Sequence, residues 1–459
     1  MTIGLIRFDV EDYLTPESDA ALIEMMDAMQ EAGLPASYGL VGKKALALRA
    51  RGANQALSRL GRESALGFHS HSHSEHPTLA EELAGLPYPQ AVRAFIAREA
   101  PGVQAIREMT GGAPRYFTQP GGNWVPEAVD ALPALGMEIF FSDAWNSYLI
   151  EWPEPLWYGS LLHLAPPVAT PRPFLLGMPG NLPEALAIAE QLPVSQPDKQ
   201  LAMVMLHPTE LVTTRFWDAV NFSAGSTAPV LSPAPLRSTG DHQAALGALR
   251  RYLAALSRVP GVEWLDVMGL TARILPRAPV AVTREEVIRL VTANGLGPAR
   301  AARGVLSAAD LVWSLAYFAW RPGTSRVQAP VLAAPAKWSE TAPISDPASV
   351  ASVDQALREV VESGRRTGRL PGEVVVGGIR LPIDMVGRYA MSRMGSRDGR
   401  PVVPAALSLK FLQFVKQPDS LHWSWPVFPP GFQPFRLWLD AKRLAWSIAP
   451  VKWRGHEEG

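Results

Sequence analysis

Four of the nine histidines in this chain fall within eight residues, at His69, His71, His73 and His76. His69 and His73 are four residues apart, so their side chains can project on one face whether the local backbone is extended or helical, and both can bind the same ion. His71 shares that face only on an extended backbone. Ordinary core or surface histidines, or an adventitious metal, are the competing interpretation. The clustering of a scarce residue after a predicted strand favours an ion site.

Carboxylates follow the first predicted strand, in the segment FDVED at residues 8–12. Because side chains alternate between the two faces of a strand, Asp9 and Glu11 point the same way and Asp12 points away unless the turn has begun. Alone, these acids would indicate a helix start or a turn, which Asp and Glu stabilise. Beside two imidazoles they indicate an open divalent-ion site, in which two neutral histidines and one carboxylate leave a coordination position for water.

The composition limits what such a site can be. The chain has no cysteine, which excludes disulfides, thiolate ligands and cysteine nucleophiles. We therefore expect an ion held by His, Asp and Glu, zinc first, with cobalt, nickel, manganese or iron as alternatives. No G-x-S-x-G motif is present, which argues against a serine α/β-hydrolase. The 43 basic and 43 acidic residues balance, so the net charge indicates no nucleic-acid partner.

The elements that must position these residues alternate between short apolar runs and helical patterns. Strands are predicted at residues 3–8, 36–41, 65–68, 116–117, 137–141, 200–206 and 262–265. Helices are predicted at 19–32, 89–109, 126–135 and 242–257, the first three of them ending at a glycine. Repeated strand-helix units favour a parallel sheet, either doubly wound or closed into a barrel. The polar residues of interest follow strands, at the carboxyl edge where ligands bind: Asp9, His69, Gln119, Asp143 and His207.

A proline-containing stretch at residues 275–282 separates this region from the rest. We predict two domains, 1–275 and 283–459, the second a smaller, mainly helical module with helices at 283–294, 308–318 and 353–366. Its tail is rich in Trp and Pro, including HWSWP at 422–426. We interpret these tryptophans as packing that closes the module against the first domain, with stacking on glycans as the alternative.

The N-terminal sequence MTIGLIRFDVED has neither a basic n-region nor an apolar h-region. No stretch approaches the roughly 20 apolar residues that a membrane-spanning helix requires. We therefore expect a cytoplasmic protein without a transmembrane segment, and the sequence leaves its oligomeric state open.

FDVED, followed by GFHSHSH at residues 67–73, resembles the first two motifs of the polysaccharide deacetylase superfamily, carbohydrate esterase family 4 with its NodB-homology domain. The resemblance covers about residues 1–275 and implies a distorted (β/α)7 TIM-like barrel there. It also implies that Asp9 is the catalytic base and that Glu11, His69 and His73 hold the metal. The neighbouring Asp12, His71 and His76 would then support the ligands or face the substrate.

Three later segments follow in the order of that family. TQPGGNW (118–124) resembles the third motif, a loop that walls the groove and supplies backbone N–H groups, and FFSDAW (140–145) resembles the fourth. AMVMLHP (202–208) resembles the last motif, where His207 would be the general acid. The third motif departs from the family at Thr118, where an arginine that orients the catalytic aspartate is usual; Arg115 lies three residues earlier. The implied groove residues are Pro120, Gly121, Gly122, Trp124, Asp143, Trp145 and Leu206.

The reaction implied by the resemblance is removal of an acetyl group from an N-acetylated amino sugar. The ion would activate water, Asp9 would take its proton, and His207 would protonate the departing amine. Two alternatives stay open. One is an allantoinase-like hydrolase of a small cyclic or linear amide, and the other, suggested by Thr118, is an inactive, metal-binding relative that binds carbohydrate. The expected partner is accordingly a carbohydrate or a small amide.

Overall fold

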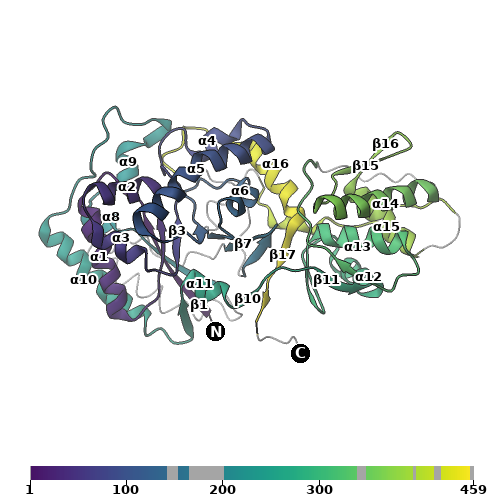
Figure 1. The fold of residues 1–459 in the computed structure, drawn as a ribbon, viewed down its shortest axis with the longest axis horizontal. Helices are drawn as coiled ribbons and strands as arrows, with labels where there is room; N and C mark the ends of the chain where they lie inside the picture. The colour runs from purple at the N-terminus through teal and green to yellow at the C-terminus, as the bar shows by residue number, and fades with distance from the viewer. Residues whose placement is uncertain are drawn as a thin grey trace.

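The computed structural model describes residues 2–141, 154–164, 201–338, 348–395, 400–417 and 425–454. A strand-rich body formed by the first part of the chain lies beside a smaller, mainly helical body formed by the later part (Figure 1). The last described segment, at the yellow end of the colour bar, runs between the two (Figure 1).

One ten-stranded sheet organises the first body. Among the described residues, seven of its strands lie in the order β8-β1-β2-β3-β4-β5-β7, and each neighbouring pair is parallel. This curled parallel sheet forms a half-barrel surrounded by helices, so the predicted α/β class and TIM-like barrel are confirmed. The strands of the sheet are β1 (Thr2–Val10), β2 (Ser37–Leu40), β3 (Leu66–Phe68), β4 (Tyr116–Phe117), β5 (Ile139–Phe141), β6 (Leu156–Tyr158), β7 (Leu161–Leu164), β8 (Leu201–Leu206), β9 (Val262–Leu265) and β17 (Ile448–Pro450).

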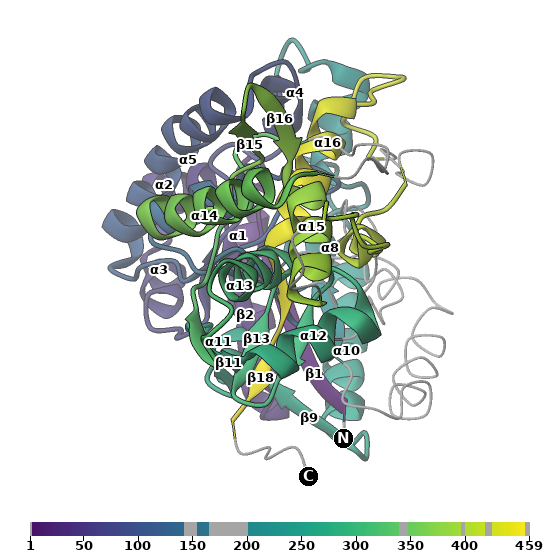
Figure 2. The same cartoon turned by 90° about the vertical axis from the view of Figure 1, so that its right-hand side faces the viewer.

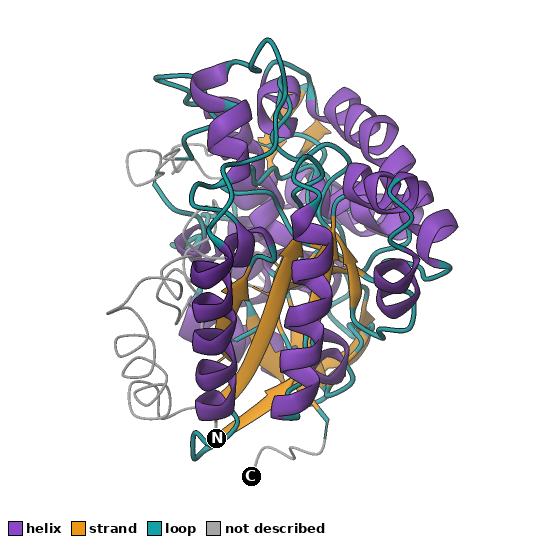
Figure 3. Cartoon of the chain, turned by 90° about the vertical axis from the view of Figure 1, so that its left-hand side faces the viewer, coloured by secondary structure: helices purple, strands orange, loops and turns teal. Residues whose placement is uncertain are grey.

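The two faces of this sheet are buried in different ways. On β1, Ile6 and Phe8 belong to the large core, which lies between the sheet and its helices and continues into the second body. Leu5 belongs instead to a second cluster inside the curl, with Phe141 and Met203. Strand alternation therefore directs the odd-numbered residues of β1 into the barrel. Helices pack on the large core at the outer side (Figure 3): α1 (Glu17–Ala32), α2 (Gly42–Ala50), α3 (Asn54–Leu60), α4 (Leu79–Ala84), α5 (Tyr88–Thr110), α6 (Ala128–Ala134), α8 (Thr209–Val212) and α10 (Thr239–Leu256). Two short helices pack elsewhere: α9 (Trp217–Asn221) belongs to a third buried cluster, and α11 (Val267–Thr271) packs on the cluster inside the curl.

The second body is built around α13, which is apolar on nearly all sides and packs against α14 and α15. A capping box begins α13: the Ser307 hydroxyl accepts the Asp310 N–H, and the Asp310 carboxylate accepts the Ser307 N–H. Figure 2 views the molecule from this helical side. The elements of the second body are β11 (Val280–Thr283), α12 (Arg284–Asn294), β12 (Ala299–Ala301), β13 (Gly304–Leu306), α13 (Ala308–Trp320), β14 (Arg326–Ala329), α14 (Val350–Thr367), β15 (Glu373–Val376), β16 (Ile379–Pro382) and α15 (Ile383–Gly395). Strand β10 (Ile274–Leu275) precedes them, and its Ile274 belongs to the cluster inside the curl.

The end of the chain returns to the first body through α16 (Phe435–Leu444), β17 and β18 (Lys452–Trp453). Strand β17 pairs antiparallel with β6 and so extends the large sheet, while β18 pairs with β10. The fully buried Trp446 packs against Trp338 and Phe411. Because this segment contacts both bodies, a division of the chain into 1–275 and 283–459 stays a prediction. No helix among the described residues is long and apolar enough to cross a membrane.

Candidate active site

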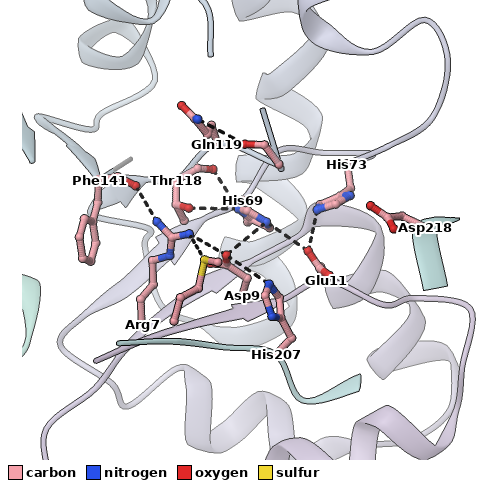
Figure 4. A network of polar contacts seen from close by, with 12 residues as sticks. Arg7, Asp9, Glu11, His69, His73, Thr118, Gln119, Phe141, His207 and Asp218 are labelled. Carbon is pink, nitrogen blue, oxygen red and sulfur yellow. Dashed lines mark hydrogen bonds and ion pairs between the residues drawn. The ribbon is translucent and has the colours of Figure 1, made fainter. Parts of the chain in front are cut away.

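Five polar side chains from three strands of the large sheet and their following loops meet at its carboxyl edge (Figure 4). Asp9 and Glu11 lie at the end of β1, His69 and His73 follow β3, and His207 follows β8. None of the five is more than 8% exposed. Parallel strands β3, β2, β1 and β8 are adjacent in the sheet, which is why residues nearly 200 positions apart in the sequence converge.

Glu11, His69 and His73 form the group that could hold a metal ion, with ligand atoms all within 4.8 Å of one another. Glu11 Oε2 lies 2.6 Å from His73 Nε2 and 3.4 Å from His69 Nε2. Both imidazoles are fixed through their other nitrogen: His69 Nδ1 lies 3.0 Å from the carbonyl oxygen of Thr118, and His73 Nδ1 contacts the Ser74 hydroxyl. Each ring therefore presents Nε2 to the carboxylate, an arrangement common to histidines that bind metals.

The loop that carries these histidines, residues 69–77, is neither extended nor helical. Ser70 and His73 have left-handed backbone angles, with φ of 69° and 53°. The regular spacing assumed from the sequence is thus not what brings His69 and His73 together, because a strained loop does so instead. Glu99 on α5 stabilises this loop, because its carboxylate accepts the N–H of His71 at 2.7 Å.

Glu11 is enclosed by donors. Its Oε1 accepts the indole N–H of Trp217 on α9 at 2.9 Å. Burial alone would raise the pKa of Glu11, but the imidazoles of His73, His207 and His69 outweigh it and hold that pKa well below its usual range. Glu11 is therefore a carboxylate at neutral pH, as a metal ligand must be.

Asp9 is held by an arginine that our sequence interpretation did not consider. The Arg7 guanidinium lies 2.8 Å from Asp9 Oδ2, and both side chains are almost completely buried. Thr118, the position where the motif departs from its pattern, instead serves His69 through its carbonyl oxygen. The sequence feature that could have indicated this role is the position of Arg7, a charged residue in the apolar run at residues 3–8, two positions before Asp9.

His207 lies on the other side of Asp9. Its Nε2 is 3.8 Å from Asp9 Oδ2, and its Nδ1 is 3.1 Å from a carboxylate oxygen of Glu210. Burial alone would lower the pKa of His207, but the Glu210, Glu11 and Asp9 carboxylates outweigh it and raise that pKa to about 10. His207 is thus protonated and can donate a proton at neutral pH. Glu210, three residues later on α8, was also missed from the sequence.

Two tryptophans from distant parts of the chain flank His73. Trp217 lies 5.2 Å from the His73 ring centroid, and Trp425 from the C-terminal part lies 5.7 Å from it. The Trp425 N–H donates to Asp218 at 3.0 Å, and its ring covers Gly121 so closely that a Cβ there would lie 2.4 Å from the ring. The C-terminal part of the chain therefore contributes a wall of the site.

The remaining predicted site residues have other contacts. Asp12 caps the turn after β1 and accepts the Thr209 hydroxyl at 2.6 Å, while the His76 ring lies 2.9 Å from Glu81. The His71 side chain packs close to Gly42. Trp124 is fully buried and stacks near Phe140, and Leu206 is fully buried as well. Pro120, Gly121 and Gly122 form the loop beneath Trp425, while Asp143 and Trp145 lie outside the described residues.

Comparison with known proteins gave matches to solved structures alone: no family model matches the chain, and neither does any curated protein. A Mycobacterium smegmatis protein assigned to the polysaccharide deacetylases matches at 14% identity and a TM-score of 0.39, covering 61% of this chain and 93% of that one. The polysaccharide deacetylase Bc1974 from Bacillus cereus matches at 12% identity and a TM-score of 0.32, covering 58% and 92%.

A CE4 family pseudoenzyme from Bacillus anthracis also matches, at 11% identity and a TM-score of 0.32, covering 58% of this chain and 64% of that one. The matching structures thus include polysaccharide deacetylases of the CE4 family and a pseudoenzyme of that family. At these low identities and TM-scores the likeness concerns the fold alone.

Proposed function

We propose that this chain is a metal-dependent hydrolase that removes the acetyl group from an N-acetylated amino sugar. The observation that supports this most is the meeting of a two-histidine, one-carboxylate group with a separate carboxylate, Asp9, and a separate histidine, His207, in one buried cluster. Such a cluster contains one group to accept a proton and one to donate it, which hydrolysis of an amide requires.

The residues present fit a divalent ion. His73 Nε2 is buried and makes no well-aligned hydrogen bond with any described residue, although it lies 2.6 Å from Glu11 Oε2. Glu11, His69 and His73 would hold the ion, with zinc as the first candidate, since imidazole and carboxylate suit it. When bound, such an ion supplies Lewis-acid polarisation of the substrate carbonyl and a water of lowered pKa.

The chain's own residues divide the proton transfers between them. Asp9 Oδ1 is buried without a hydrogen-bond partner among the described residues, so it is available to accept a proton from the attacking water. His207 carries a proton that it can donate to the departing nitrogen, and Glu210 steadies its Nδ1 side. We assign the backbone N–H groups of the Gly121–Gly122 turn to the developing oxyanion.

A small cyclic or linear amide is the second candidate substrate. The supporting observation is the enclosure of the site, since Glu11, His69 and His73 are each no more than 3% exposed and Trp425 lies over their edge. An internal unit of a long polysaccharide would require this cover to move, whereas a short substrate would not. The third candidate, an inactive relative that binds carbohydrate, rested on Thr118 standing where an arginine usually orients the aspartate. It loses support because Arg7 pairs with Asp9 instead.

Acetate release from chitooligosaccharides, with and without a chelator, tests the proposal. We expect release that depends on the metal, is lost on chelation and returns when zinc is added. His69→Ala should abolish both metal binding and activity. His242→Ala is the matched control, because His242 pairs with Glu24 on the outer helices and should leave both unchanged. Acetate release that persists after complete removal of the metal would reject the mechanism, and amide hydrolysis without any acetate release would favour the second candidate.

A further inference from the structure

Arg7 is a cation buried inside the barrel. It lies on β1 between Leu5 and Asp9 on the inward face, and its side chain is 2% exposed. Burying a guanidinium costs several kcal/mol unless charged and polar partners compensate for the lost water. The apolar residues around it, Phe141 among them, supply no charge.

The contacts of Arg7 fix its guanidinium in one place. One terminal nitrogen donates to the carbonyl oxygen of Phe141 at the end of β5, at 3.1 Å. The other lies 2.8 Å from Asp9 Oδ2 and 2.7 Å from the sulfur of Met205 on β8. These partners lie on three different strands, so the position of the guanidinium is fixed by the sheet. The guanidinium therefore holds the Asp9 carboxylate in one position (Figure 4).

Asp9 is correspondingly dependent on Arg7. Its carboxylate is 3% exposed, and Arg7 is its only arginine or lysine partner among the residues that the structure describes. The imidazoles of His207 and His69 are farther from Oδ2, at 3.8 and 3.9 Å. With Oδ2 held by Arg7, the second oxygen, Oδ1, is left without a hydrogen-bond partner in the part of the chain that the structure describes.

We infer that Arg7 is the positioning residue of the proton-accepting carboxylate: it anchors one oxygen of Asp9 from inside the barrel and leaves the other oriented and available. This inference rests on the proposed function for its catalytic consequence. The pairing of Arg7 with Asp9 can be tested without activity. No hydrogen bond or ion pair joins Arg7 to Glu11, His69 or His73, so its loss should impair turnover without releasing the metal.

The kinetic test compares Arg7→Met, Arg7→Lys and a control in acetate release from chitooligosaccharides. For Arg7→Met we expect kcat to fall by about tenfold or more, since a misplaced general base loses much of its contribution, with KM and metal content unchanged. Arg7→Lys should recover part of kcat. The control is Arg277→Met, which removes another buried arginine. Arg277 pairs with Asp310 at 2.6 Å and bonds Gly159 and Ser447, none of them a site residue, so this variant should lower stability while keeping kcat.

Thermal unfolding of the same variants tests the pairing of Arg7 with Asp9 directly. Arg7→Met should lower the melting temperature strongly, because it leaves the Asp9 carboxylate buried and unpaired. In the Asp9→Asn background the same change should lower it much less. Equal losses in both backgrounds, or a kcat of Arg7→Met equal to that of the unaltered protein, would overturn the inference. Should the unaltered protein show no hydrolysis of any substrate, the proposed function fails, and the unfolding comparison still decides the pairing.

Discussion

Glu99 is the acidic residue that secures the histidine loop, and it is itself fully buried. It accepts the His71 N–H at 2.7 Å and the Ser70 hydroxyl at 3.3 Å. Burial raises its pKa from 4.5 to about 7, although Arg98 and these hydrogen bonds act in the opposite direction. The folded chain therefore keeps a proton on Glu99 at pH values where the unfolded chain has lost it.

The sign of the resulting pH dependence follows from this difference. Between pH 4.5 and about 7 the folded state binds the extra proton, so the contribution of Glu99 to stability falls as the pH rises through this window. The full loss is about 3 kcal/mol, at 1.36 kcal/mol per pKa unit. Glu99→Gln cannot ionise and keeps an acceptor for the His71 N–H. We expect it to be more stable than the unaltered protein at pH 8, by up to about 3 kcal/mol, with the difference vanishing near pH 4.5.

Urea denaturation of both proteins across this pH range measures the difference. Glu362→Gln, an exposed change on α14, is the control and should show a small difference that does not vary with pH. A constant difference between the Glu99 variant and the unaltered protein would mean that Glu99 ionises normally in the folded chain.

At the scale of single elements, local patterns predicted most of the first body. Strands β9 and β4 lie where the sequence predicted them, and α1, α5 and α10 are within a few residues of their predicted bounds. Gly33 and Gly111 end α1 and α5 in the left-handed conformation, as glycines that stop helices do. Short elements such as α3 and α4 were missed, because about two turns carry too little periodicity to identify a helix.

The site was predictable in part, for reasons that differ from residue to residue. Asp9, Glu11, His69, His73 and His207 end or follow predicted strands, and the parallel order of the sheet brings them together. The left-handed residues of the histidine loop are set by packing and leave no local pattern. The sequence alone indicates that Trp425 is a packing residue. Trp425 reaches the site only because the chain returns to the first body about 200 residues after Asp218, and local periodicity does not encode such a return.

The loop that carries Trp425 supplies the next prediction. Its indole covers Gly121 and bonds Asp218, so Trp425→Ala removes a wall of the site without removing a metal ligand. We expect KM for the chitooligosaccharide to rise roughly tenfold, equivalent to about 1.4 kcal/mol of binding, with metal content unchanged. Trp438→Ala is the matched control, because Trp438 on α16 bonds the Lys416 carbonyl outside the site. Equal KM values for the two variants would exclude Trp425 from substrate binding.

At the scale of the whole molecule, the C-terminal segment joins the two bodies as well as walling the site. Strand β17 extends the sheet, the Tyr158 hydroxyl donates to the Ala441 carbonyl at 2.8 Å, and Arg436 pairs with Glu127 at 2.7 Å. The sequence predicted a tail that packs against the first domain, but not that it would add a strand to the sheet. The partner of an edge strand is determined by the tertiary structure, and a three-residue strand is too short for its sequence to indicate that partner.

Arg277, between the two bodies, provides the test of how strongly they depend on each other. Its guanidinium donates to the carbonyl oxygens of Gly159 in the first body, at 2.8 Å, and Ser447 in the C-terminal segment, at 3.0 Å. It also pairs with Asp310 at the start of α13, at 2.6 Å, with both side chains no more than 2% exposed. One side chain therefore connects three parts of the fold.

Arg277→Met leaves the Asp310 carboxylate buried without its cation and leaves two buried carbonyl groups without this donor. We expect a loss of about 3–5 kcal/mol in the free energy of unfolding, measured by denaturant titration, since breaking one side of a buried ion pair costs that much. Arg380→Met is the control: Arg380 on β16 is 73% exposed and its pair with Glu373 should contribute less than about 1 kcal/mol. If both variants lose the same small amount, the two bodies are stabilised independently. A large loss confined to Arg277→Met would instead show that the packing of the two bodies on each other contributes to the stability of the whole chain.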